Sequence, residues 1–290
     1  MSARPVIERA LVFAGLISLA AAGCVDRPKG TWVMCHNANC AGPPDPERDD
    51  RLESLSESLA LNYEGRPLLD GVEIDVFWHG AAGRCLFAHD QESAPSSDEA
   101  RAAGEAIAEY VRRPGPRSFN GEIFAIRMEL KGFVGSLGDE HTDEQARLHA
   151  ECALDLFELY RQAALESNNA IVVIFDSSAP KVLETLVQRP RWPGRTASGQ
   201  VQVRLSADFV DSTPSELAFQ RLEDFPAVDD VVFHAGWIND AHYQAFRSLD
   251  LEMTLWMFSA TVETFDAVER FEPRAVLTSE APLFRRWLEY

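Results

Sequence analysis

The segment "GVEIDVFWHGAAGRCLFAHD" (residues 71–90) begins as an apolar, strand-like run that contains two acidic residues. Successive side chains of a strand alternate between its faces, so Glu73 and Asp75 point to the same side. A buried carboxylate is costly unless it is paired or bound to a metal. The segment therefore predicts a strand that presents two carboxylates to one site, and residues 84–90 predict a hairpin behind it.

Strand-like and helix-like runs alternate along the rest of the chain. The predicted strands cover residues 30–35, 71–77, 123–130, 170–176, 201–207, 230–235, 252–258 and 275–278. The predicted helices cover residues 48–63, 98–113, 143–166, 180–188, 214–222, 240–249, 261–271 and 282–289.

Eight strands, each followed by a helix, within roughly 260 residues predict a single α/β domain, a (β/α)8 TIM barrel over residues 30–290. A doubly wound open sheet is the main alternative. Such a sheet would be expected to have a glycine-rich phosphate turn after its first strand. The segment "CHNANC" (residues 35–40) contains no glycine, so the barrel is favoured.

The N-terminus has the pattern of a secretory signal. Arg4 and Arg9 precede an uncharged apolar run from Ala10 to Ala22, which is too short for a stable membrane span. The following "LAAAGC" is similar to a bacterial lipobox, whose cysteine becomes lipidated. We therefore expect a signal peptide over residues 1–23, a tether over residues 24–29 from lipidated Cys24, and an exported protein anchored in the bacterial envelope. An ordinary signal peptide cut nearby is the alternative.

The net charge of the chain is −19 at pH 7. A surface this acidic repels nucleic acids and anionic membranes at long range. We therefore expect no nucleic-acid partner, and membrane contact only through the lipid anchor. An anionic substrate would have to be attracted by local positive charge.

In a TIM barrel the reacting groups lie at the carboxyl ends of the strands. Glu73, Asp75 and Glu129 fall there, and three bare carboxylates cannot share a cavity unless their pKa values rise or a hard divalent cation binds. Oxygen ligands favour Mg²⁺ or Ca²⁺, and Asn37 offers a further neutral oxygen. Lys131 beside this cluster indicates an anionic substrate.

His36 and His89 follow neighbouring strands and form a candidate acid/base pair. A metal, a lysine and two histidines around one point suit attack on phosphorus. Each residue alone has a simpler interpretation: a structural histidine, an exposed strand edge, a Glu129–Lys131 ion pair, or a core tryptophan at Trp256. Their conjunction at one end of the barrel favours a site, with Trp256 lining its pocket.

Four cysteines remain after Cys24, and export permits disulfides. Four cysteines allow three pairings, among which a sequence does not choose. We predict a Cys40–Cys85 bridge, because both residues fall near the proposed site.

This combination of residues resembles the phospholipase C-like phosphodiesterase superfamily, and most closely its glycerophosphodiester phosphodiesterases. The matching positions are His36, the Glu73–Asp75 pair, His89–Asp90 and Glu129–Lys131. Residues 251–284, with Trp256 and Thr278–Ser279, are similar to that family's seventh strand and final motif. The resemblance implies one metal held by the three carboxylates with Asn37, a phosphate oxygen on Lys131, and acid and base roles shared by His36 and His89.

Some positions depart from that family. The usual His-Arg is His36–Asn37, which looks like phosphatidylinositol-specific phospholipase C. With Asn39 and Trp256 the set also looks like the sphingomyelinase D branch, although that branch has Asp at the position of Glu129. The expected function is hydrolysis of glycerophosphodiesters or phospholipid head groups, with water or a substrate hydroxyl as nucleophile. The alternative is a catalytically silent barrel lipoprotein with a binding or envelope structural role.

Overall fold

The computed structural model describes residues 30–89, 97–121, 123–131, 142–195, 197–209 and 222–289. Eight parallel strands form a closed barrel, in which β1 pairs with both β13 and β4. The barrel strands are β1 (Trp32–Cys35), β4 (Gly71–His79), β7 (Ile123–Leu130), β8 (Ala170–Ser177), β10 (Val201–Asp208), β11 (Asp230–His234), β12 (Glu252–Met257) and β13 (Ala275–Thr278). The predicted TIM barrel is confirmed.

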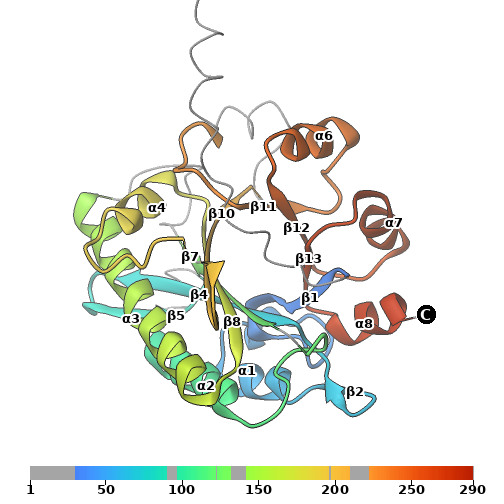
Figure 1. Ribbon diagram of the computed structural model, residues 1–290, viewed down its shortest axis with the longest axis horizontal. Helices are drawn as coiled ribbons and strands as arrows, with labels where there is room; N and C mark the ends of the chain where they lie inside the picture. Colours follow the sequence, from blue (N-terminus) through green and yellow to red (C-terminus); the bar gives the residue numbers. More distant parts are fainter. Residues whose placement is uncertain are drawn as a thin grey trace, which may run out of the picture.

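Helices surround the strands (Figure 1). They are α1 (Leu52–Leu59), α2 (Ala100–Arg112), α3 (Asp143–Ser167), α4 (Pro180–Val187), α6 (Asp240–Ser248), α7 (Val262–Phe271) and α8 (Ala281–Glu289). A capping box starts α3, because Thr142 Oγ1 accepts from the Gln145 amide at 3.2 Å and Gln145 Oε1 accepts from the Thr142 amide at 2.9 Å. The predicted helix at 214–222 lies outside the described residues. Within the described ranges, no helix has the length and apolar character needed to span a bilayer.

The first helix begins four residues later than the sequence pattern predicts. Residues Pro46–Arg48 form a short 3-10 turn, and the Asp45 side chain accepts from the Glu47 amide at 3.1 Å. Asp50 has a φ of 53°, a left-handed conformation that breaks a continuous helix. The acidic residues before α1 therefore form a loop over the end of the barrel.

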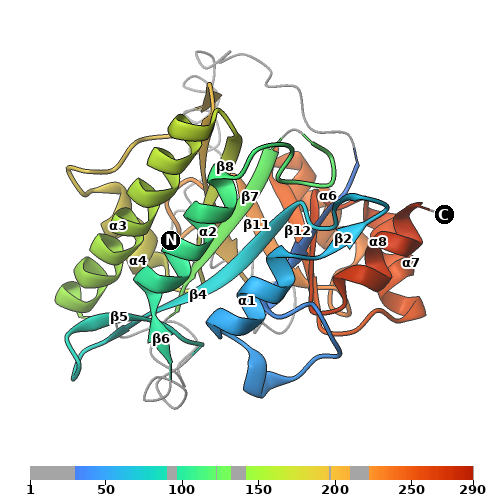
Figure 2. The ribbon, with the colours of Figure 1, turned by 90° about the horizontal axis from the view of Figure 1, so that it is seen from below.

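The predicted hairpin is present. Strand β5 (Arg84–Phe87) runs antiparallel to β4, and β6 (Asp98–Glu99) pairs antiparallel with β5. This three-stranded extension projects beyond the barrel beneath α3 (Figure 2). The Ala88 amide also donates to the Asp75 carbonyl at 3.3 Å, so the chain after β5 stays against the end of β4.

The apolar side chains form two layers. The larger one packs the outward faces of the strands against the helices, and a smaller cluster that includes Trp32, Met34, Ile174 and Leu277 fills the barrel interior. Gly71 belongs to the interior, where an added Cβ would lie 2.5 Å from the Ala125 carbonyl oxygen. Only glycine allows β4 and β7 to approach this closely at that level.

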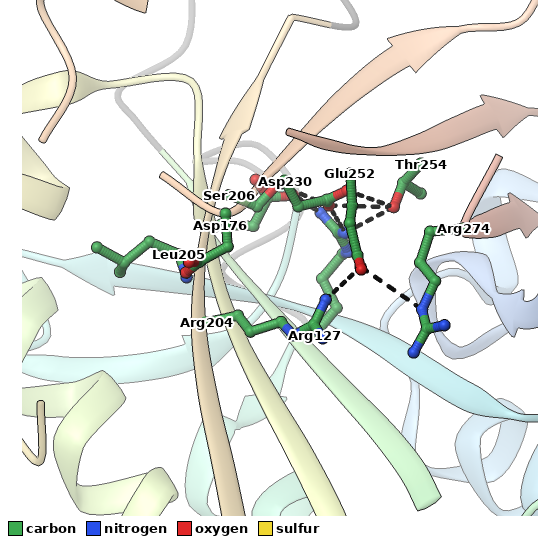
Figure 3. A network of polar contacts seen from close by, with 10 residues as sticks. Arg127, Asp176, Arg204, Leu205, Ser206, Asp230, Glu252, Thr254 and Arg274 are labelled. Atoms are coloured by element: carbon green, nitrogen blue, oxygen red, sulfur yellow. Dashed lines mark hydrogen bonds and ion pairs between the residues drawn. The ribbon is translucent and has the colours of Figure 1, made fainter. Parts of the chain in front are cut away.

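A polar network fills the middle of the barrel (Figure 3). The buried Arg127 guanidinium donates to Asp176 at 2.7 Å, to Ser206 at 3.0 Å and to Thr254 at 2.9 Å, and it also pairs with Asp230. These partners come from β8, β10, β11 and β12. One side chain on β7 thus connects the strands across the interior, directly beneath the level of Glu129.

Both described disulfides differ from the predicted Cys40–Cys85 bridge, which is wrong. Cys35 pairs with Cys40, with a Cα–Cα distance of 5.5 Å, and Cys85 pairs with Cys152 at 6.2 Å. The turn after β1 brings Cys40 back to Cys35. The hairpin directs Cys85 toward α3 instead.

Candidate active site

A cavity of about 470 Å³ lies at the carboxyl ends of the strands. Of the predicted site residues that the structure describes, all but one line this cavity: His36, Asn37, Glu73, His89, Glu129, Lys131 and Trp256. The exception is Asp75, which lies buried at the edge of the cavity. A second cavity, of about 510 Å³, lies at the opposite end near Thr31 and Arg274 and contains none of these residues. Cys24 and Asp90 lie outside the described residues.

Three carboxylates meet at the centre of the site. Asp75 pairs in register with Glu129 across β4 and β7, and Glu73 stands two residues before Asp75 on the same face. One oxygen from each of the three groups lies within 4.8 Å of the others, and all three residues are buried. The alternation along the two strands therefore produces one cluster.

Lys131 is the counter-charge of this cluster. Its Nζ lies 2.6 Å from Glu129 Oε1 and 3.6 Å from Asp75 Oδ2. Burial alone would lower the pKa of Lys131, but the attraction of Asp75 and Glu129 outweighs it and raises the pKa well above its usual range. The ammonium is therefore charged at neutral pH.

The pKa values of the buried carboxyl groups shift in different directions. Burial, followed by repulsion from neighbouring carboxylates, raises the pKa values of Asp50, Glu73 and Asp75 well above their usual range. Burial also acts on Glu129, but the adjacent Lys131 outweighs it and lowers the pKa to about 2. One lysine does not compensate four buried acids, so the metal-free cluster keeps protons that a bound cation would replace.

His36 and Asn37 lie in a tight turn after β1 (His36–Ala38), and the Cys35–Cys40 disulfide closes this turn. Asn37 has a φ of 46°, a conformation that asparagine tolerates better than most residues. The Asn37 amide donates to Glu73 Oε2 at 2.7 Å. The turn is thus tied to the acidic cluster through its backbone.

Two cavity-lining residues that the sequence interpretation missed, Asp49 and Asp50, come from the loop before α1. The Asp49 carboxylate accepts from the side-chain amide of Asn37 at 3.3 Å and from that of Asn39 at 2.9 Å. Asp50 Oδ1 accepts from the Asp75 amide at 3.4 Å. Glu47 of the same loop is exposed and does not line the cavity. The available signal was the acidic pair that precedes Arg51 and the first apolar helix residue, Leu52.

The two histidines differ in environment. His36 is buried, its Nδ1 lies 3.4 Å from Ser279 Oγ, and burial together with the Lys131 charge lowers the pKa of His36 to about 3. Its imidazole is therefore neutral near pH 7. His89 is exposed and lines the cavity from the segment after the hairpin.

Aromatic side chains form the wall of the cavity beside His36. Trp256 and Phe258 both line the cavity, with ring centroids 5.4 Å and 5.7 Å from the His36 ring. Phe258 was missed, although it is two residues beyond Trp256, the spacing of one strand face. Asp208 also lines the cavity and was missed because the predicted strand ended at residue 207.

Two further strand-end residues, Asp176 and His234, lie close to the site. Asp176 reaches the cavity lining, but its carboxylate pairs with Arg127, and burial raises its pKa to about 6. His234 packs against Trp256 and Trp237, with ring centroids 5.0 Å and 4.9 Å away. His234 does not line the cavity.

The barrel is similar to those of solved phosphodiesterases. A phosphodiesterase of Oleispira antarctica, solved with the product sn-glycerol-3-phosphate, matches 89% of this chain and 97% of its own at 11% identity and a TM-score of 0.59. A glycerophosphodiester phosphodiesterase of Thermotoga maritima matches 89% and 98% at 15% identity and a TM-score of 0.53. A Silicibacter pomeroyi protein assigned to the glycerophosphoryl diester phosphodiesterases matches 90% and 94% at 11% identity and a TM-score of 0.61.

No protein-family model matches the sequence, and no curated protein shows significant sequence similarity to it. The structural likeness extends over nearly the whole length of these neighbours. It establishes that the chain has the barrel fold of glycerophosphodiester phosphodiesterases, which belong to the phospholipase C-like phosphodiesterase superfamily.

Proposed function

We propose that the protein is a metal-dependent phosphodiesterase that hydrolyses glycerophosphodiesters or phospholipid head groups. The observation that carries the proposal is the cluster of Glu73, Asp75 and Glu129 around Lys131, in a cavity that also contains two histidines. Carboxylates alone would repel an anionic diester, whereas a divalent cation and an ammonium attract it.

The residues present fit a divalent cation. Both carboxylate oxygens of Asp75, Asn37 Oδ1 and Asp50 Oδ2 are buried without a hydrogen-bond partner among the described residues. Such oxygens are costly unless a cation or proton satisfies them. Glu73, Asp75 and Glu129, with Asn37, would hold the ion, and an all-oxygen set favours Mg²⁺ or Ca²⁺. A bound cation would supply Lewis-acid polarisation of a phosphoryl oxygen.

The protein's own groups have separate roles in this proposal. The Lys131 ammonium, which is held in place by Glu129, binds a phosphoryl oxygen. The neutral His36 imidazole accepts a proton from the nucleophile or returns one to the leaving group. His89, which lines the cavity from the segment after the hairpin, takes the complementary role. Both histidines are therefore required for turnover.

We further propose that the mature chain acts in the bacterial envelope, tethered through a lipid on Cys24. The support is the N-terminal sequence pattern. Labelling of the full chain with a fatty acid in a bacterial host, and loss of the label in Cys24→Ala, is the expected result. Label retained in the variant would contradict this anchor.

Phosphorus NMR of the unlipidated domain tests the activity. The substrates are glycerophosphodiesters, phosphatidylinositol and sphingomyelin, with Mg²⁺ or Ca²⁺ and again with EDTA. A new phosphorus signal that EDTA suppresses is the expected result, and its chemical shift separates a monoester from a cyclic product. Glu73→Gln and His89→Ala should lower the rate by at least about 100-fold, the scale of a general acid or base.

Matched controls exclude a folding defect. His79→Ala lies on the same hairpin and outside the cavity lining, and Glu47→Gln removes an exposed acid near the site. Both should retain wild-type rates. Wild-type rates in Glu73→Gln or His89→Ala would contradict the assigned roles. No turnover by a folded wild type that also binds neither Mg²⁺ nor Ca²⁺ would favour a catalytically silent barrel lipoprotein.

A further inference from the structure

Part of the cavity wall consists of two aromatic side chains that the catalytic roles above do not use. The Trp256 and Phe258 rings lie 4.3 Å apart between centroids in an edge-on arrangement. Both face the cavity that contains Lys131, and Phe258 is 48% exposed. A substrate held by its phosphate at Lys131 would therefore extend its next atoms along an open aromatic surface.

The same cavity is rich in carboxyl groups. Asp208, at the end of β10, lines it together with Asp49 and Asp50, and Asp208 is only 8% exposed. Among the described lining residues the carboxylates outnumber the arginine and lysine side chains. The proposed divalent cation, Lys131 and Arg51 supply fewer positive charges than these carboxylates carry when ionised, and a bound phosphodiester adds one more negative charge. The remaining field therefore favours a positive group on the substrate.

We propose that the Trp256–Phe258 wall binds a quaternary ammonium group, so that the preferred substrate is a choline-type phosphodiester. This inference rests on the proposed phosphodiesterase activity. An aromatic face attracts a cation through its quadrupole. A trimethylated ammonium is weakly hydrated and needs no hydrogen-bond acceptor, whereas a primary ammonium loses hydrogen bonds to water against a ring face. An uncharged glycerol head group is attracted neither by the aromatic rings nor by the carboxylates.

The test compares three diesters with one metal-loaded preparation: glycerophosphocholine, glycerophosphoethanolamine and glycerophosphoglycerol. We expect kcat/KM to favour the choline ester over the other two by roughly tenfold, the scale of one desolvated cation–π contact. In Phe258→Leu, which keeps an apolar side chain but removes the ring, this ratio should fall toward one. The loss should appear mainly in KM for the choline ester.

Trp237→Leu is the matched control. Trp237 is a half-exposed aromatic residue at the same end of the barrel, packed on His234, but it does not line the cavity. Its variant should keep the wild-type choline preference. A similar loss of preference in both variants would overturn the assignment to Phe258.

The remaining outcomes are also decisive. Equal kcat/KM values for the three esters, or a preference for the ethanolamine ester, would overturn the quaternary ammonium site and leave the phosphodiesterase activity in place. Turnover of none of the three would refute the activity. In that case tryptophan fluorescence titrated with choline and with ethanolamine tests the wall directly. Tighter choline binding, weakened in Phe258→Leu, is expected, and equal affinities would overturn it.

Discussion

The orientation of the Asn37 side chain depends on its hydrogen-bond partners. Its side-chain amide nitrogen donates to Asp49, which leaves Oδ1 buried and without a partner at the edge of the acidic cluster. The backbone amide of the same residue donates to Glu73. The orientation of the Asn37 oxygen therefore depends on a carboxylate that does not itself belong to the three-carboxylate cluster.

Replacement of Asp49 tests this dependence. In Asp49→Ala the Asn37 amide loses its orienting acceptor, and we expect the affinity for Mg²⁺ or Ca²⁺ to fall by roughly 10-fold to 100-fold, as for other residues that orient a metal ligand. Calorimetric titration of the metal measures it. Glu47→Ala, an exposed acid of the same loop, should leave the affinity unchanged. An unchanged metal affinity in Asp49→Ala would show that a group other than Asp49 orients the Asn37 side chain.

The acidic cluster also predicts a pH dependence of stability. The raised pKa values of Asp50, Glu73 and Asp75 mean that the metal-free native state keeps protons that the unfolded chain releases above about pH 4. The free energy of unfolding of the metal-free protein should therefore decrease as the pH rises from 5 to 8. A divalent cation replaces these protons, so its stabilising effect should increase over the same range.

Thermal unfolding at pH values from 5 to 8, with EDTA and with Mg²⁺ or Ca²⁺, measures how the metal-free stability and the stabilisation by the cation each change with pH. Asp75→Asn removes a cluster charge and should flatten the metal-free slope. A melting temperature that rises with pH in EDTA would contradict the interpretation.

At the scale of elements, each candidate catalytic histidine lies beside its own disulfide. Cys35–Cys40 spans five residues and encloses the turn with His36 and Asn37. Cys85–Cys152 spans 67 residues and fastens the hairpin, which leads to His89, to α3. The first bridge constrains a small part of the site, whereas the second constrains a large part of the chain.

The two bridges should therefore differ in their effects. Chain-entropy estimates give about 2 kcal/mol for a five-residue loop and about 4 kcal/mol for a 67-residue loop. We expect Cys85→Ser/Cys152→Ser to lose the larger unfolding free energy in urea. Cys35→Ser/Cys40→Ser should lose the larger fraction of kcat, because it frees the His36 turn. The reverse order in either measurement would contradict this division.

At the scale of the whole molecule, the barrel interior is divided into levels. An acidic cluster lies at the carboxyl end, the Arg127 network lies in the middle, and Arg204 and Arg274 pair with Glu252 at the amino end (Figure 3). Arg127 is buried with Asp176 and Asp230, so its loss would leave two carboxylates unpaired. The network supports Glu129 from beneath.

Arg127→Met should accordingly cost about 3–5 kcal/mol of unfolding free energy, the usual effect of breaking a buried ion pair. Arg204→Met is the matched control, because Arg204 is partly exposed and pairs only with Glu252 among the interactions shown in Figure 3. Its loss should be about 1 kcal/mol. Urea unfolding of both variants measures the difference, and equal losses would argue against a central role for Arg127.

Much of the molecule follows from local patterns. The alternation of strands and helices predicted the barrel. The predicted strand at 170–176 matches β8 to within one residue, because its first six residues are the continuous apolar run of a buried parallel strand. The two-residue spacing in Glu73–Asp75 and in Glu129–Lys131 put each pair on one face. The predicted start of the first helix was too early because the helical periodicity of the sequence extends back into the loop before α1. In that loop the left-handed conformation of Asp50 prevents a continuous helix.

The sequence by itself thus determined the barrel, the end at which the candidate site lies, and the faces that carry the carboxylates. These features depend on side-chain periods of 2 and 3.6 residues, which are written in short stretches of chain. Only the tertiary structure decided the disulfide partners, the place of Asp49 and Asp50 in the site, and the contact of Phe258 with His36. Those depend on which distant segments meet when β1 pairs with β13 and β4, and no local pattern contains that information.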